Sequence, residues 1–170
     1  LGVLEYHAAT ADPAPLAYAR RWADHYDYRI CGSNPAGHHN INHQLSGAVY
    51  VELFSLDGNQ THLQDTAKVL GEEIADPSTT NYWRWVDLLN MAMATYSRMG
   101  NATGNAAYFE KQFANFNASA LMPPDGLNNT FGFWNASAEL FYRDDRWRGT
   151  DTYWARGNGW ALTALVSALR

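Results

Sequence analysis

The sequence is poor in several features that would place it in a particular class of protein. It has a single cysteine among 170 residues, which excludes a framework of internal disulfides. No apolar run approaches the roughly 20 residues that a membrane-spanning helix needs. Only 17% of the residues are charged and the net charge is -5, so the chain offers no basic stripe to a nucleic acid. We therefore expect a globular protein whose partners are neither nucleic acids nor membranes.

Aromatic side chains, in contrast, are abundant. The chain has seven tryptophans, ten tyrosines and seven phenylalanines. These residues are typical of a well-packed core, and their flat apolar faces and polar tips also suit a site for sugar rings. Composition leaves both interpretations open.

N-glycosylation sequons are also frequent. The asparagines that begin an Asn-x-Ser/Thr pattern are Asn59, Asn101, Asn117, Asn128 and Asn135. This number exceeds what chance would give, so we expect a secreted, extracellular glycoprotein of fungal or other eukaryotic origin. No signal peptide precedes Leu1, which begins in the middle of a pattern, and we expect the chain to be an interior piece of a longer protein.

Helical periodicity dominates the chain. It predicts helices over 16–28, 42–56, 60–75, 82–99 and 104–117, a final helix from near Asn158, and short strands over 131–134 and 140–142. Thr80 and Asn81 are the candidate caps of the 82–99 helix, and Gly100 is its predicted end.

Two kinds of helix alternate along the sequence. The segments 42–56 and 82–99 are apolar nearly all round, whereas 60–75 and 104–117 have one polar face. This alternation predicts a two-layered ring of helical hairpins with the apolar helices inside. A plain antiparallel bundle would fit the same pattern.

Asp87 stands in an apolar helix, beside Trp85 and Val86. A carboxylate buried there costs several kcal/mol unless it is paired or protonated. One interpretation is a structural aspartate that caps a helix or pairs with Arg84. The other is a proton donor that keeps its proton near neutral pH because its apolar surroundings disfavour the charged form.

The segment YWARGNGW, near the end of the chain, combines a cation with two tryptophans and two glycines. Arg156 is expected just before a helix N-terminus, with Asn158 as a cap, where free N–H groups already favour anions. A guanidinium there adds a bidentate clamp for a carboxylate, and Trp154 and Trp160 add stacking faces. The pattern fits a binding site for an acidic sugar. A structural Arg–Asp pair among core tryptophans would be compatible with the same sequence.

Four segments resemble the successive motifs of glycoside hydrolase family 105, the unsaturated rhamnogalacturonyl hydrolases, which are related to the family 88 unsaturated glucuronyl hydrolases. They are NHQLSGAVYVELF, YWRWVDLLNMAMATYSRMG, LFYRDDRW and YWARGNGWALTALVSAL. The resemblance covers residues 40–170 in the correct order, and the Trp-Ala-Arg-Gly-Asn-Gly-Trp segment is its most specific part.

This resemblance implies an all-α fold, an (α/α)6 barrel of helical hairpins. At common helix and loop lengths a full barrel needs roughly twice as many residues. We therefore expect residues 1–170 to be part of a single glycoside hydrolase domain and to supply about half of it, with the remainder in sequence not present here.

The implied reaction removes a 4,5-unsaturated uronic acid from the non-reducing end of pectin-derived rhamnogalacturonan oligosaccharides, by hydration of the double bond. By motif position Asp87 is the catalytic acid, and Trp154, Arg156 and Trp160 hold the unsaturated uronate. The partner is thus an unsaturated acidic oligosaccharide, with no cofactor and no metal.

The chain departs from the family pattern at several substrate-binding positions. It carries Asn42 or His43 where an aspartate is usual, and Arg143 where a histidine is frequent. A histidine expected shortly before the catalytic aspartate is missing, since Asp76 and Asn81 stand in that region. These departures concern substrate choice and activity more than the fold.

Two other functions compete with this one. An ordinary glycosidase could use two carboxylates, Asp87 with Asp144 or Asp145. A non-catalytic sugar-binding relative would explain the missing second aspartate. A metalloenzyme is disfavoured because the histidines His38, His39 and His43 have no clear carboxylate or cysteine partners.

Overall fold

The structure is a computed structural model, and it describes residues 1–30, 40–76, 83–121 and 132–169. Its elements are α1 (Gly2–Thr10), α2 (Pro13–His25), α3 (Ile41–Asp57), η2 (Gln60–Leu63), α4 (Gln64–Ala75), α5 (Val86–Thr103), α6 (Ala107–Phe116), η3 (Asn117–Leu121), β1 (Trp134–Asn135), β2 (Leu140–Phe141), η4 (Asp145–Trp147) and α7 (Ala155–Ala168). The two short strands pair antiparallel, with Trp134 opposite Phe141. The expected all-α class is confirmed.

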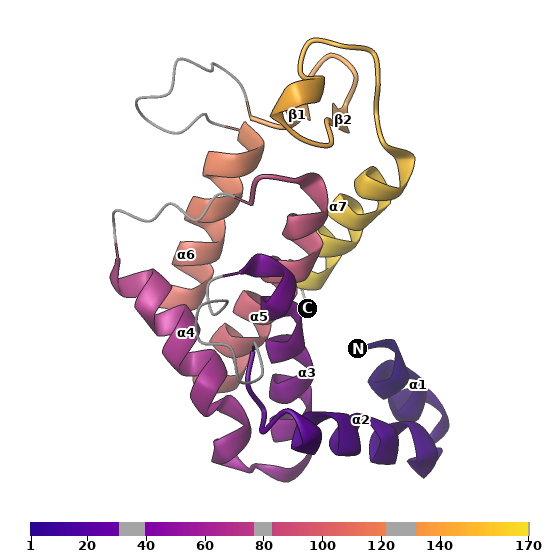
Figure 1. The fold of residues 1–170 in the computed structure, drawn as a ribbon, viewed down its shortest axis with the longest axis vertical. Helices are drawn as coiled ribbons and strands as arrows, with labels where there is room; N and C mark the ends of the chain where they lie inside the picture. The colour runs from indigo at the N-terminus through magenta and orange to yellow at the C-terminus, as the bar shows by residue number, and fades with distance from the viewer. Residues whose placement is uncertain (31–39, 77–82, 122–131, 170) are drawn as a thin grey trace.

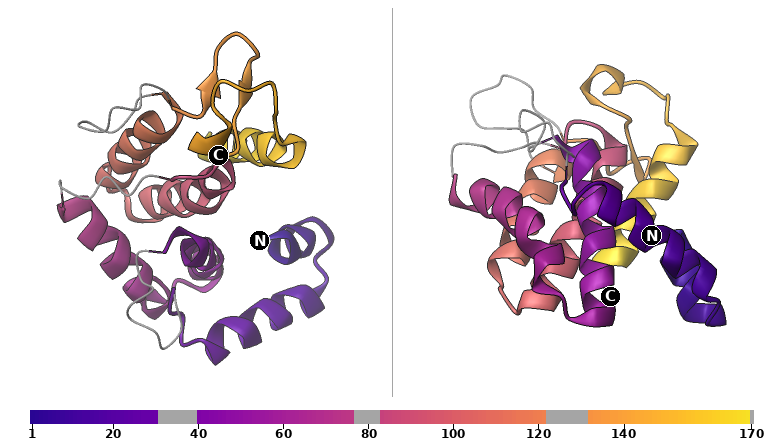
Figure 2. Two further views of the ribbon diagram at one scale, coloured as in Figure 1. Left: turned by 45° about the horizontal axis from the view of Figure 1, so that its top comes forward. Right: turned by 60° about the horizontal axis from the view of Figure 1, so that its bottom comes forward.

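The helices form two curved layers (Figure 1, Figure 2). In the inner layer α5 packs between α3 and α7, while α4 and α6 lie outside it. A second apolar cluster joins α1, α2 and α3 through Leu4, Ala19, Ala23, Tyr50 and Leu53. The prediction that the two most apolar helices line the inside of a helical array is therefore confirmed.

Two glycines allow the inner helices to approach each other closely. A Cβ atom on Gly47 of α3 would lie 2.8 Å from the Thr95 Cγ2 atom of α5. On the other side of α5, a Cβ on Gly157 of α7 would lie 2.5 Å from the Cγ1 atom of Val86. Real Cβ atoms do not come this close to other carbons, so glycine sets the spacing of α3, α5 and α7.

A buried polar group ties the outer layer to the inner one. Glu73 of α4 is 1% exposed, and its carboxylate accepts hydrogen bonds from Gln44 of α3 (2.6 Å) and from the Tyr96 hydroxyl of α5 (2.5 Å). Burial, together with the nearby Glu73, raises the pKa of Tyr96, so the phenol remains a donor. These bonds fix the start of α3 relative to α5.

The inner helix α5 differs from its predicted bounds at both ends. It begins at Val86 instead of Tyr82, with Trp85 at the N-cap, and it continues to Thr103. Gly100 does not end the helix. It lies inside α5, where a Cβ atom would clash with the Phe109 Cζ of α6, so glycine here allows the ring to pack. Gly104 ends α5 instead, in the left-handed region with φ +69°.

Other boundaries also move. α2 starts at Pro13, where the Asp12 side chain accepts a hydrogen bond from the Ala14 N–H at 2.9 Å, and it stops at His25. α7 begins at Ala155, three residues before the predicted start. The N-terminal helix α1 was not predicted, because its apolar residues do not follow one face and only Leu4 is buried. The cap candidates Thr80 and Asn81 lie outside the described residues.

Within the described ranges, no helix combines the length and the apolar character that crossing a bilayer requires.

Candidate active site

The inner helices α3, α5 and α7 all begin at the same end of the array (Figure 1). The first turns of these helices carry Asn42 and His43, Asp87, and Arg156 respectively. Helix N-termini leave backbone N–H groups unpaired, and their dipoles favour anions. This end of the array is therefore suited to a negatively charged ligand.

Asp87 is half-buried in the first turn of α5. The predicted 82–99 helix puts Asp87 in its second turn. That position is wrong, because α5 begins at Val86. The start of α5 has no side-chain cap hydrogen bond, and among the described residues Asp87 forms no ion pair or side-chain hydrogen bond with Arg84 or any other residue. The two structural roles considered for this carboxyl, capping and pairing with Arg84, are therefore not observed.

Two contacts place Asp87 beside the segments that carry the predicted arginines. The Val86 N–H donates to the carbonyl of Arg143 at 2.9 Å, which satisfies one of the free donors at the start of α5. Gly157 packs directly on the Val86 side chain. The first turn of α5, the segment around Arg143 and the first turn of α7 thus meet at one place.

The predicted cluster of cation and tryptophans is present. The Arg156 Cζ lies 4.8 Å from the Trp154 ring centroid and 5.4 Å from that of Trp160. The two indoles meet edge to face at 5.2 Å. The Arg143 Cζ is 5.8 Å from the Trp154 ring, so two guanidinium groups share one indole. Both arginines are exposed and can meet a carboxylate in solution.

The local structure around Arg156 differs from the prediction in two respects. Arg156 lies within the first turn of α7, after the N-cap residue Trp154, and not before the helix. Asn158 is not a cap. Its side chain donates to the Phe141 carbonyl at 2.9 Å and accepts from the Phe141 N–H at 2.7 Å, so it fastens strand β2 to α7.

Asp144 is buried, with 1% of its surface exposed, and both of its carboxylate oxygens are engaged. Arg146 donates to them through Nε at 3.0 Å and Nη2 at 2.9 Å, and the Nη1 of Arg143 lies 3.5 Å away. The hydrogen bond from the Arg146 side chain holds the pKa of Asp144 below its usual value. This geometry suits an orienting role for Arg143, and it disfavours Asp144 as the second carboxylate of a glycosidase. The Asp145 side chain lies outside the described part of the chain.

Asn135, which begins the last sequon, is engaged in the fold. The Asn135 Nδ2 donates to the hydroxyls of Tyr142 and Tyr153, each at 2.7 Å, and its Oδ1 accepts from the Ser137 N–H at 2.9 Å. A glycan on that nitrogen would have to replace at least one of these bonds. The Asn59 side chain is engaged as well, with its Nδ2 3.2 Å from His62 Nε2 and its Oδ1 accepting from the Thr61 N–H at 3.1 Å. Asn59 and Asn101 are exposed and Asn117 is half-buried, while Asn128 lies outside the described residues.

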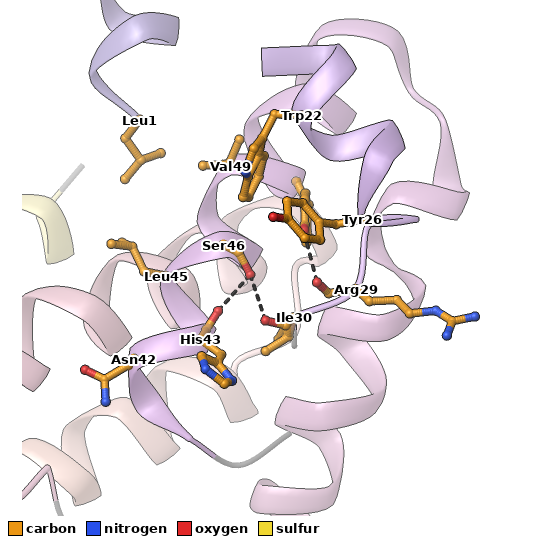
Figure 3. A pocket seen from close by; sticks show the side chains of 11 residues that line it. Leu1, Trp22, Tyr26, Arg29, Ile30, Asn42, His43, Leu45, Ser46 and Val49 are labelled. Carbon is orange, nitrogen blue, oxygen red and sulfur yellow. Dashed lines mark hydrogen bonds between the residues drawn. The ribbon is translucent and has the colours of Figure 1, made fainter. Parts of the chain in front are cut away.

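Asn42 and His43 are exposed at the start of α3, where the Asn40 side chain accepts from the Asn42 N–H at 3.0 Å. They line one end of a pocket of about 540 Å³ whose other end carries the rings of Trp22 and Tyr26 (Figure 3). The structure thus brings Arg143, Trp154, Arg156 and Trp160 together, with Asp87 on the adjoining turn, and leaves Asn42 and His43 on a neighbouring helix.

Among the described residues, no three His, Cys, Asp or Glu side chains lie close enough to hold an ion together. His38 and His39 lie outside those residues.

The fold is similar to that of two solved structures. One is described as a polysaccharide lyase and the other as a glycosyl hydrolase family 88 protein from Bacteroides vulgatus; both match with a TM-score of 0.85 and 24% sequence identity. The match covers 99% of this chain in each case, and 50% and 51% of those two chains. The chain therefore spans about half the length of these relatives, and identity this low shows the fold alone.

Among curated proteins, none matches the chain. The sequence model of Glycosyl Hydrolase Family 88, in contrast, matches residues 1–170. The ordered motifs around Asp87 and Arg156, the two-layered helical array and this match over the whole chain agree. The chain belongs to glycosyl hydrolase family 88.

Proposed function

We propose that the protein is a glycoside hydrolase that removes a 4,5-unsaturated uronic acid from the non-reducing end of acidic oligosaccharides. The observation that carries the proposal is the position of Asp87. It is a half-buried carboxyl with no hydrogen-bond or ion-pair partner among the described residues, on the turn that adjoins the cluster of Arg143, Trp154, Arg156 and Trp160. A proton donor next to two guanidinium groups and two indole rings suits a flattened, negatively charged sugar ring.

In this mechanism Arg156 binds the uronate carboxylate, with Arg143 as a second cation on the same indole. The indoles of Trp154 and Trp160 pack on the flattened ring. Asp87 donates its proton to C4 of the double bond, and water adds to C5 while its proton passes to the Asp87 carboxylate. The hemiketal at C5 then opens, and the hemiacetal left at C1 expels the remaining sugar.

The substrate can be narrowed further. The segments around Asp87, Arg143 and Arg156 resemble the motifs of the related family 105, whose members act on rhamnogalacturonan fragments of pectin. We therefore propose pectin-derived rhamnogalacturonan oligosaccharides as the substrate, with Asn42 and His43 contacting its more distant part. The sequons at exposed positions such as Asn101 support secretion of the protein.

A second candidate is a sugar-binding protein without hydrolytic activity. This candidate is favoured by the start of α3, where Asn42 and His43 stand at the position of a usual family aspartate and provide no carboxylate. Such a protein would still use the cluster of tryptophans and arginines to bind unsaturated uronates.

One assay separates these functions. The whole protein is incubated with pectin fragments produced by a lyase, and the ultraviolet absorbance of the double bond is followed together with the release of sugar. The proposed hydrolase consumes the chromophore as it releases sugar. An ordinary glycosidase releases sugar with the chromophore intact, and a binding protein does neither; either result would refute the proposal.

A further inference from the structure

A second, smaller pocket adjoins the cluster that contains Arg156. It has a volume of about 290 Å³ and is lined by Arg143, Trp147, Thr152, Tyr153 and Trp154. Two of these residues, Arg143 and Trp154, also belong to the proposed uronate site. The pocket therefore begins where the uronate site ends.

The walls of this pocket suit a carbohydrate ring. Trp147 and Trp154 offer indole faces, Tyr153 adds a third aromatic ring, and Trp147 is 38% exposed. Arg143 supplies hydrogen-bond donors at the edge shared with the uronate site. Its volume is at the lower end of the range for small-molecule sites, so it admits one ring and not an extended chain.

The walls are also held in place before any ligand arrives. Tyr153 stacks on Tyr142 with ring centroids 5.2 Å apart, and the Asn135 side chain donates to both hydroxyls. The Asp144 Oδ2 lies 3.5 Å from the Arg143 Nη1 and restrains that guanidinium. A preformed site loses less conformational freedom on binding, which favours affinity.

We infer that this pocket binds the sugar ring next to the unsaturated uronate, the one released by the reaction, with Trp147 as its stacking face. The inference rests on the proposed function, because the uronate site sets the position of the neighbouring ring. It assigns to Trp147 a role in substrate choice that is separate from the chemistry at Asp87.

Trp147 can be replaced without disturbing the turn that carries it. The hydrogen bonds that close this turn use the Trp147 backbone, whose carbonyl accepts from the N–H and the hydroxyl of Thr150 at 3.2 and 2.7 Å. Removal of the indole in Trp147→Ala leaves these bonds intact. We therefore expect the variant to fold, with a melting temperature near that of the parent.

Titrations with two ligands test the inference. One is an unsaturated uronyl disaccharide and the other is the methyl glycoside of the same unsaturated uronic acid, which lacks the second ring. All titrations use protein with Asp87→Asn, so that the ligands are not consumed. We expect Trp147→Ala to weaken disaccharide binding by about tenfold, as for an aromatic anchor, and to leave the methyl glycoside unaffected. Trp147→Phe should restore most of the lost affinity.

The matched control is Phe113→Ala, which removes a 68% exposed aromatic ring from the outer helix α6. It should change neither affinity. Equal weakening of both ligands by Trp147→Ala, no weakening of either, or no binding of the disaccharide would each overturn the inference. The proposed function fails differently, when the parent protein leaves the double bond intact.

Discussion

Gly157 offers a quantitative test of the packing that brings the site together. In Gly157→Ala the new Cβ would lie 2.5 Å from Val86 Cγ1 and 2.6 Å from Trp154 Cε3. Neither neighbour can move freely, since Val86 begins α5 and Trp154 caps α7. Forcing a methyl group into such a contact costs about 2–3 kcal/mol. Replacing a helical glycine by alanine returns about 0.5–1 kcal/mol, so the expected net loss is about 1–2.5 kcal/mol.

Gly159, two residues further along the same helix, is the matched control. Nothing lies within 4 Å of the position its Cβ would take. Gly159→Ala should therefore raise the free energy of unfolding by about 0.5–1 kcal/mol. The measurement is denaturant unfolding of the whole protein with each substitution, accompanied by titration with an unsaturated uronate. Opposite signs for the two variants, with weaker binding in Gly157→Ala, are expected. If both alanines stabilise the protein, the proposed contact between α7 and the start of α5 is wrong.

Three further predictions concern individual side chains of the site. Asp87→Asn should lower turnover by roughly 10²–10⁴-fold while binding survives, because the amide cannot deliver a proton. Loss of the chromophore is measured together with the melting temperature, and a rate like that of the parent would end the catalytic assignment. Arg156→Lys should weaken uronate binding by about tenfold or more, since the bidentate guanidinium is replaced by an ammonium that acts as a point charge. Unchanged affinity in a titration would argue against binding of the uronate carboxylate by Arg156. Asp144→Asn should destabilise the fold at neutral pH. Because the pKa of Asp144 is lowered in the folded state, its contribution is present above the unfolded pKa and lost as pH falls through the folded pKa. The melting temperatures of parent and variant should thus converge on strong acidification, and a constant difference would contradict this.

The features that sequence predicted well are those set by short-range patterns. The alternation of fully apolar and one-sided helices predicted the inner and outer layers, because burial follows the distribution of apolar residues around a helix. The grouping of Trp154, Arg156 and Trp160 was predictable because the three residues lie within two turns of one another. The short strands were also close to their predicted places, although Phe131 lies outside the described residues.

The features that sequence missed depend on contacts between distant segments. The start of α5 could not be located from local caps, because the partner of its Val86 N–H is the carbonyl of Arg143. Sequence predicts Asn158 as a helix cap, yet its side chain is hydrogen-bonded to the backbone of strand β2. Asp144 reads as a possible catalytic carboxyl, and only the structure shows that arginines occupy its oxygens. An -RDDR- segment, with opposite charges two residues apart, was the one signal that could have indicated this pairing.

The hydrogen bond between Val86 and Arg143 has a consequence for the order of folding. A helix whose first turn has a local cap can form early, but α5 has no side-chain cap and relies on a residue far along the chain. The middle of α5 can become helical as soon as its apolar face packs against other helices. Its first turn must wait until the segment after β2 has packed against it, and this non-local step closes a long loop. The turn that carries Asp87 would then be completed late and would open first in native-state fluctuations. Amide hydrogen exchange along α5 should therefore be faster at its N-terminal end than at its centre.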